Sequence, residues 1–347
     1  MGSLGTQIYQ TARFVARRVG GLRYRTLLHP RSPTRLLGLT YASDRAGDGA
    51  GAQLLRSYAI YALSRLLGFP YIHTPMAGLN YQGIVAFQKN ETDPELIKRY
   101  NDLFTIPSDM AVPENVSNHV IHTVDLSDLS RLKTQTVRSG EFQLARIVSP
   151  FLITDTYPDC YESLKSISPF PFLPSQPVRI AVHVRRGDLL FRESQRLLGI
   201  DYYLNVIRRL EGILDELKLD RQYELYTELP TKCQPQGLGG ESVHDSKLNG
   251  LDSDAEAGMI AQFDAVPNLV KYINTDPIEA IQRMATAHVV IMSHSAFSYL
   301  PSLLNVRGVI IYHRFWHMPL RNWVIASDGG RFSKRSLVRR LQAATIC

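Results

Sequence analysis

The sequence predicts an α/β protein with two doubly wound units. Residues 36–42 form an apolar run typical of a buried strand, and a glycine-rich loop follows at 44–51. Apolar residues then recur at helical spacing over 54–67. A strand, a loop and a helix in this order begin a doubly wound unit. A second series of the same kind starts at residue 178.

The second series alternates strands with helices over a longer stretch. Strands are predicted at 179–184, 224–226, 269–273, 289–292 and 309–312, and helices at 202–217, 277–287 and 296–304. Asp276 and Pro277 are typical of the N-cap and first turn of a helix. The alternation therefore continues the α/β pattern of the first unit.

The length of 347 residues fits two domains. We expect a basic N-terminal arm or targeting segment at 1–35, an α/β domain at 36–175, a second α/β domain at 178–326 and a basic tail at 327–347. The boundary between the domains falls in the proline-rich stretch 168–177, which favours extended chain. Residues 231–258 are polar and rich in Gly, Ser and Asp, which indicates a loop inserted in the second domain.

The net charge of +7 comes from the two ends of the chain. Residues 1–43 carry seven arginines and no acid, residues 331–347 carry five basic side chains and no acid, and the rest holds 27 basic and 32 acidic residues. A nucleic-acid partner is not expected, because binding a phosphate backbone needs a concentrated basic patch. The three cysteines are far apart and indicate neither a disulfide framework nor a zinc site. No run is long enough to predict a transmembrane segment.

The arginine-rich N-terminus leaves the compartment open. A stretch with many arginines and no acids fits a basic arm, or an organellar targeting peptide of the mitochondrial or plastid type. Residues 1–6 also match the minimal myristoylation pattern. No secretory signal is seen, because no apolar stretch follows a charged start. Without targeting, the expected location is the cytoplasm.

The most informative motif is Val-His-Val-Arg-Arg-Gly-Asp at 182–188. It follows an apolar strand, and open α/β sheets bind their ligands beyond the carboxyl ends of the strands. Arg185 and Arg186 each offer a planar fork of donors that suits a diphosphate. The alternative is an ordinary charged turn at the end of a strand.

Two further loops are candidate binding elements. The glycine-rich loop holds Gly47, Gly49 and Gly51. It brings backbone close to a ligand or makes a tight strand-to-helix turn. The turn Ser-His-Ser-Ala-Phe-Ser at 293–298 precedes a helix, whose N-terminus is a natural phosphate site. Helix capping by serine alone is the other interpretation of this turn.

Taken together, these motifs resemble GDP-fucose-dependent fucosyltransferases. The sequence is most similar to the α1,2-fucosyltransferase family and more distantly to the α1,6- and protein O-fucosyltransferases. The resemblance rests on 183–188 and 293–299, with support from Tyr202-Tyr203 and from 226–228. The segment Gly47 to Gln53 resembles the family's N-terminal glycine-rich loop but departs from its usual Gly-Asn-Gln form.

The resemblance implies a GT-B-like enzyme, with two Rossmann-like domains facing a cleft. The domain at 36–175 would serve the acceptor, and the domain at 178–326 would hold the nucleotide sugar. The expected reaction is an inverting transfer of fucose from GDP-fucose to a glycan hydroxyl, with an α1,2 linkage as one option. The alternatives are a transferase for another nucleotide sugar and a non-catalytic nucleotide- or sugar-binding module. Oligomeric state is not predicted.

The resemblance also implies roles for individual residues. The expected donor-binding residues are His183, Arg185, Arg186, Asp188, Ser293, Ser295, Phe297 and Ser298, and those of the glycine-rich loop are Gly47, Gly49, Gly51 and Gln53. Arg185 is the first choice for the diphosphate, while Asp188 would orient His183 or Arg185. The base that deprotonates the acceptor is either Glu193, which lies just beyond the motif, or Asp48 in the glycine-rich loop.

We expect no metal and no cofactor besides the donor substrate. No Asp-x-Asp motif accompanies the sugar site. The sequence Asp-Ser-Asp at 252–254 has those letters, but it lies in the polar insertion and is interpreted as a solvated loop.

Overall fold

The computed structural model describes residues 35–45, 48–89, 92–122, 126–156, 158–171, 177–187, 189–192, 197–230 and 253–345. Residues 1–34 of the predicted arm and 231–252 of the predicted insertion lie outside these ranges. The chain divides into two compact units. The first comprises Met1–Ala46, Gln53–Gly78 and Phe104–Ile167, and the second comprises Gly47–Ala52, Leu79–Leu103 and Ser168–Cys347.

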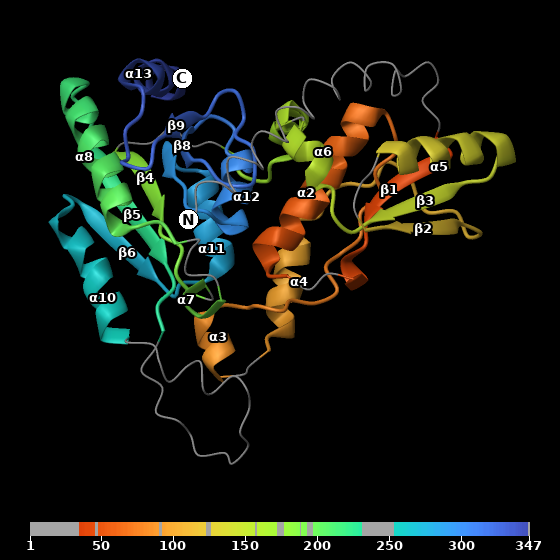
Figure 1. The fold of residues 1–347 in the computed structure, drawn as a ribbon, viewed down its shortest axis with the longest axis horizontal. Coiled ribbons are helices and arrows are strands. Elements are labelled where there is room, and N and C mark those ends of the chain that lie inside the picture. Colours follow the sequence, from red (N-terminus) through yellow and green to blue (C-terminus); the bar gives the residue numbers. More distant parts are fainter. Residues whose placement is uncertain are drawn as a thin grey trace, which may run out of the picture. The chain divides into compact units, whose positions relative to one another are not determined.

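The first unit is built on a three-stranded parallel sheet in the order β1-β3-β2 (Figure 1). Its strands are β1 (Leu37–Tyr41), β2 (Ser117–Ile121) and β3 (Gln143–Ile147). Its helical segments are η1 (Ser43–Arg45), α5 (Leu126–Ser139), α6 (Phe151–Thr156), η2 (Pro158–Ile167) and all but the first turn of α2 (Ala50–Leu67). Every residue of β1 is buried, including Thr40, as its mostly apolar sequence predicts.

The second unit is built on a six-stranded parallel sheet in the order β6-β5-β4-β7-β8-β9. Its strands are β4 (Val178–His183), β5 (Arg221–Thr227), β6 (Leu269–Ile273), β7 (Val289–Ile291), β8 (Val309–His313) and β9 (Val324–Ala326). Its helical segments are α3 (Ile84–Lys89), α4 (Pro94–Leu103), α7 (Leu189–Arg192), α8 (Ile200–Glu216), α10 (Ser253–Ala261), η4 (Gln262–Ala265), α11 (Pro277–Ala285), α12 (Ala296–Leu304) and α13 (Lys334–Thr345).

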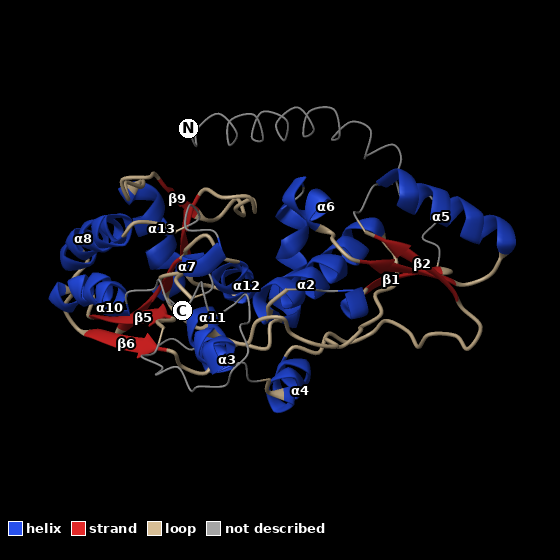
Figure 2. Ribbon diagram, turned by 60° about the horizontal axis from the view of Figure 1, so that its bottom comes forward, coloured by secondary structure: helices blue, strands red, loops and turns tan. Residues whose placement is uncertain are grey.

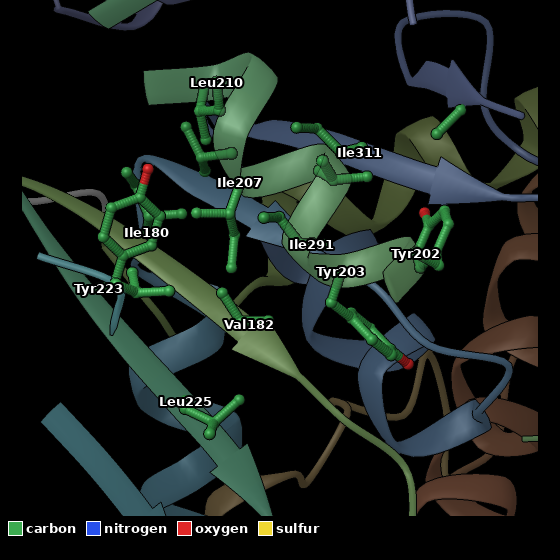
Figure 3. Packing of buried hydrophobic residues seen from close by; sticks show 14 of the residues in the cluster. Ile180, Val182, Tyr202, Tyr203, Ile207, Leu210, Tyr223, Leu225, Ile291 and Ile311 are labelled. Atoms are coloured by element: carbon green, nitrogen blue, oxygen red, sulfur yellow. The ribbon is translucent and has the colours of Figure 1, made fainter. Parts of the chain in front are cut away.

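Helices cover both faces of the six-stranded sheet. In Figures 1 and 2, α8 and α10 lie on one side of the strands, and α11 and α12 lie on the other. Figure 3 shows the apolar face of α8 packed on the strands, with Ile207 and Leu210 above Ile180, Val182 and Ile291. The spacing of the apolar residues in α8 therefore gives the helix the face that covers the sheet. The predicted α/β class is confirmed, since both sheets are parallel and carry helices.

The unit boundaries differ from the expected ones in two places. Residues 48–52 and 79–103 belong to the second unit, although they precede the proline-rich stretch by many residues. The segment after 326 was expected to be a basic tail, but α13 buries Leu337 and Leu341 in the core beside α8 and the strands. The sequence of α13 is rich in arginine, but its apolar residues recur at helical spacing and form one face of the helix.

The burial of α13 predicts a large stability loss on truncating its apolar face. Leu337 is 0% exposed, so Leu337→Ala should lower the free energy of unfolding by about 2–5 kcal/mol through lost burial and a residual cavity. Denaturant unfolding measures this loss. Gln342→Ala on the exposed side of the same helix is the control and should change little. Equal, small effects of both substitutions would show that the helix is not part of the core.

Candidate functional site

The candidate site lies where the strand order of the second sheet reverses. β4 has β5 on one side and β7 on the other, so connections leave these neighbouring strands in opposite directions along the sheet. Ligands of open α/β sheets bind beyond the carboxyl ends of the strands at such a point. β4 ends in the motif at 183–188 and β7 ends in the turn at 293–298. The parallel pairing of Val182 with Ile291 brings the two motifs together.

His183 joins the two motifs directly. Its Nδ1 lies 2.6 Å from the Oγ of Ser293, and its ring centroid lies 5.5 Å from that of Phe297. Burial, together with the nearby charge of Arg185, lowers the pKa of His183 to about 3. The imidazole is therefore neutral at physiological pH and serves as a hydrogen-bonding link between the strand ends.

The serine turn is organised by its own hydroxyl groups. Ser295 caps α12 by accepting a hydrogen bond from the backbone N–H of Phe297, at 3.1 Å. The Oγ of Ser298 is buried and lies 3.2 Å from the carbonyl oxygen of Ser295. These contacts are those of serines that cap a helix, which is one of the two interpretations of the turn given above. The part of the turn that lines the cavity described next is Ser295–Phe297.

A cavity of about 700 Å³ opens beside these motifs. Pockets for small ligands in proteins commonly measure roughly 300–1,000 Å³. Every residue that lines the cavity belongs to the second unit. The wall is formed by 48–52, by parts of 79–100, by the loops after β4, β5 and β6, and by the first residues of α11 and α12.

Gly51 allows two helix N-termini to meet at this cavity. A Cβ at Gly51 would lie 2.8 Å from the Cα and 2.9 Å from the N of Phe297, which excludes any side chain there. The first turn of α2 therefore packs on the first turn of α12. A Cβ on Gly49 would lie 3.5 Å from the carbonyl oxygen of Tyr81, an ordinary contact distance, so this position does not require glycine. The close approach at Gly51 is the role that the glycine-rich loop plays within the described residues.

Gln53 does not line the cavity. It is buried in the first unit, where its Nε2 donates to the carbonyl oxygen of Gly78 at 2.7 Å. Gly47, Asp188 and Glu193 lie outside the described residues, so their expected roles stay predictions.

The two arginines of the motif have different surroundings. Arg185 is half-buried and lines the cavity, with its guanidinium carbon 6.0 Å from the centroid of the Tyr81 ring. Arg186 is only 4% exposed, and its Nε lies 3.3 Å from the Oε2 of Glu256 on α10. Breaking a buried ion pair of this kind is costly. Both arginines line the cavity, but Arg186 is buried and pairs with Glu256 on α10, whereas Arg185 is the more exposed of the two.

Glu228 is a cavity residue that the sequence reasoning did not single out as a site residue. It follows β5, and its Oε2 accepts a hydrogen bond from the hydroxyl of Tyr81 at 2.9 Å. Gly187 has a φ of +54°, and a Cβ on it would lie 2.3 Å from the Oε2 of Glu228. The positive φ favours glycine at this position of the motif, and the missing Cβ leaves the space that the carboxylate of Glu228 occupies. The resemblance to the fucosyltransferases at 226–228 could have indicated Glu228, because these residues end β5, the strand next to β4.

An aromatic wall forms another side of the cavity. The rings of Tyr226 and Tyr272 stack at 5.0 Å with an interplanar angle of 10°, and Arg283 lies 4.6 Å from the centroid of Tyr272. Behind them, Glu224 accepts hydrogen bonds from Arg179 and Tyr226. Burial alone would raise the pKa of Glu224, but these hydrogen bonds and the arginine charges lower it overall. A buried, ionised carboxylate therefore fixes the wall from behind.

The remaining charged groups at the cavity are Asp48, Asp93, Arg99 and Asp276. Asp276 caps α11, as its sequence position predicts, by accepting hydrogen bonds from the N–H groups of Ile278 and Glu279 at 3.0 Å each. Its other carboxylate oxygen pairs with Arg99 at 2.8 Å. Among the residues that the structure describes, no group of three or more His, Cys, Asp and Glu side chains could hold a metal ion.

Comparisons with solved structures find remote likenesses, including the two that follow. No protein-family model and no curated protein matches the sequence. A point mutant of Arabidopsis thaliana FUT1 in complex with GDP is similar over 90% of this chain and 78% of its own, at 9% identity and a TM-score of 0.37. Sucrose-phosphate synthase from Thermosynechococcus elongatus is similar over 91% and 71%, at 13% identity and a TM-score of 0.27. Both TM-scores are below 0.5, so what the site binds is inferred from its own residues.

No described helix has both the length and the apolar character needed to span a membrane.

The lowered pKa of His183 predicts a loss of stability in acid. The unfolded chain takes up a proton on this residue below about pH 6.5, while the folded chain stays unprotonated down to about pH 3. Acid therefore favours unfolding in this window, and His183 alone contributes about 2 kcal/mol of loss between pH 7 and pH 5. In His183→Gln, the unfolding free energy should fall by that much less over the same interval.

Denaturant unfolding at the two pH values checks this difference, whatever the substitution costs at pH 7. His122→Gln is the matched control, because His122 is exposed. A pH dependence unchanged in His183→Gln would contradict the burial of a neutral imidazole.

Proposed function

We propose that this protein is a glycosyltransferase whose nucleotide-sugar donor binds in the cavity of the second unit. The observation that carries the proposal is the convergence of Arg185 with the N-termini of α2 and α12 on one cavity wall. The positive ends of helix dipoles and an arginine fork are the groups that proteins use for phosphate. Their position at the reversal of strand order is where such sheets bind nucleotides.

The same groups suit the chemistry of the transfer. When the bond between the sugar and the β-phosphate breaks, negative charge collects on the departing nucleotide. Donors fixed in advance around that charge stabilise the transition state without having to reorganise. Arg185 serves this role, and the helix starts at Ala50 and Ala296 support it. Arg186 also lines the cavity and adds positive charge there while it pairs with Glu256 on α10.

We further propose GDP-fucose as the donor and a glycan hydroxyl as the acceptor. The proposal rests on the fucosyltransferase-like motifs at 183–188 and 293–299, which meet through the hydrogen bond between His183 and Ser293. It includes a GT-B-like arrangement, with the first unit on the acceptor side, and an inverting transfer for which an α1,2 linkage is one option. It also includes independence from metal, because the arginine and the helix dipoles supply the positive charge.

The test is a panel of donors. GDP, GDP-fucose, GDP-mannose and UDP-sugars are titrated by calorimetry, and transfer from each sugar to a mixture of glycans is followed by mass spectrometry. We expect GDP and GDP-fucose to bind best and transfer to survive saturating EDTA. Preferred binding of a UDP-sugar would contradict the donor. Activity lost in EDTA and restored by Mn²⁺ or Mg²⁺ would contradict the metal-free mechanism.

Arg185→Ala should reduce the rate of transfer by roughly 10²–10³, the scale seen on removing one preorganised charge-stabilising donor. Arg185→Lys should recover only part of the rate, since an ammonium keeps the charge but loses the fork. Arg208→Ala is the control, because Arg208 lies exposed on α8. Steady-state kinetics and thermal unfolding are measured together. A folded Arg185→Ala variant with near-wild-type turnover, or one that no longer folds, would contradict the assignment.

A further inference from the structure

An inverting transfer needs a group that takes the proton from the acceptor hydroxyl. The cavity wall carries a carboxylate suited to this in Glu228, which comes directly after the last residue of β5. The inference that follows rests on the proposed function and adds to it the identity of this proton acceptor.

The sheet places Glu228 beside Arg185. β4 and β5 are parallel neighbours in which His183 pairs with Tyr226, so Arg185 and Glu228 stand two residues beyond paired positions. The backbone pairing continues past the strands, because the N–H of Gly187 donates to the carbonyl oxygen of Glu228 at 3.3 Å. The arginine proposed for the leaving group and this carboxylate therefore leave adjacent strands at the same level.

Tyr81 connects these two residues. Its hydroxyl donates to the Oε2 of Glu228 at 2.9 Å, and its ring faces the guanidinium of Arg185 at 6.0 Å. Two glycines leave room for the carboxylate. A Cβ on Gly187 would lie 2.3 Å from its Oε2, and a Cβ on Gly83 would lie 3.3 Å from its Oε1. Both glycines have positive φ values, of +54° and +112°. The hydroxyl of Tyr81 thus orients the carboxylate of Glu228 in the space that the two glycines leave on the cavity wall.

We infer that Glu228 is the carboxylate that accepts the acceptor's proton, and that Tyr81 is the positioning residue that holds it. In the step, the acceptor oxygen forms a bond to the anomeric carbon of the donor sugar, and its proton passes to Glu228. The bond from the anomeric carbon to the β-phosphate oxygen breaks, and its electron pair leaves with the nucleoside diphosphate beside Arg185. Asp48 lines the same cavity and is the rival acceptor of the proton.

The experiment compares full-length variants in transfer and in donor binding. Glu228→Gln keeps the shape of the side chain but not its ability to take a proton, so transfer should fall by about 10²–10⁴ while the Kd for GDP stays the same. Glu228→Asp keeps a proton acceptor but withdraws it by one methylene, and should retain part of the rate. Glu216→Gln is the matched control, because Glu216 lies on α8 and pairs with Lys334 at an exposed position. Its transfer rate should not change.

Two further arms separate proton transfer from a structural role. Azide needs no deprotonation, so in Glu228→Ala it should accept the sugar and restore turnover as a glycosyl azide. Tyr81→Phe keeps the ring beside Arg185 but removes the hydrogen bond to the carboxylate. It should lower kcat on the order of tenfold, with the donor Kd unchanged.

The inference is overturned if Glu228→Gln transfers sugar at the wild-type rate, or if its loss of rate follows an equal loss of GDP binding. It is also overturned if azide fails to restore turnover in a Glu228→Ala variant that binds GDP, or if Asp48→Asn alone abolishes transfer. A wild-type chain that neither binds nor uses any nucleotide sugar refutes the proposed function itself. A wild-type chain that transfers sugar, alongside an equally active Glu228→Gln, refutes only the role of Glu228.

Discussion

The hydrogen bond between His183 and Ser293 holds together the region on which the rest of the site depends. It closes the gap between the ends of β4 and β7, where the order of the strands reverses. Because the imidazole is buried next to Arg185, it stays neutral and leaves the positive charge to the guanidinium. The ring of Phe297 lies against the same imidazole, so the start of α12 takes its position from this contact as well.

The second constraint on this region is the presence of glycine at two close contacts. These glycines matter because they lack a side chain as well as because their backbone is less restricted. Gly51 lets the first turn of α2 reach the backbone of Phe297, and Gly187 leaves the volume that Glu228 occupies. The walls of the cavity are therefore set by close contacts between backbone and side chains of different segments. The ion pairs of Arg186 with Glu256 and of Arg99 with Asp276 then fix helices α10 and α4 around it.

Sequence patterns predicted the parts of this arrangement that are local. The apolar run at β4, the serine cap of α12 and the Asp276 cap of α11 are each encoded within a few residues. The role of Tyr81 was not predicted, because its partner Glu228 is 147 residues away in the chain. The same holds for 79–103, whose place in the second unit depends on contacts that no local pattern expresses. The segment of α13 was expected to be a basic tail because its basic residues were noted and the helical spacing of its apolar residues was not.

The composition of the second unit has a consequence for biosynthesis. The core of the second unit includes residues of α13, and its cavity wall includes the segment from Asp48 to Ala52. These two segments lie far apart in the chain, so the ribosome synthesises them at very different times. The described segments of the first unit end at Ile167 and are available much earlier. Since domains tend to fold as their chain is completed, the first unit has all its pieces while the second still exposes unpaired strand edges. During that interval the nascent chain presents β4, α8 and β5 without α11 and α12, the helices that later cover the other face of the sheet.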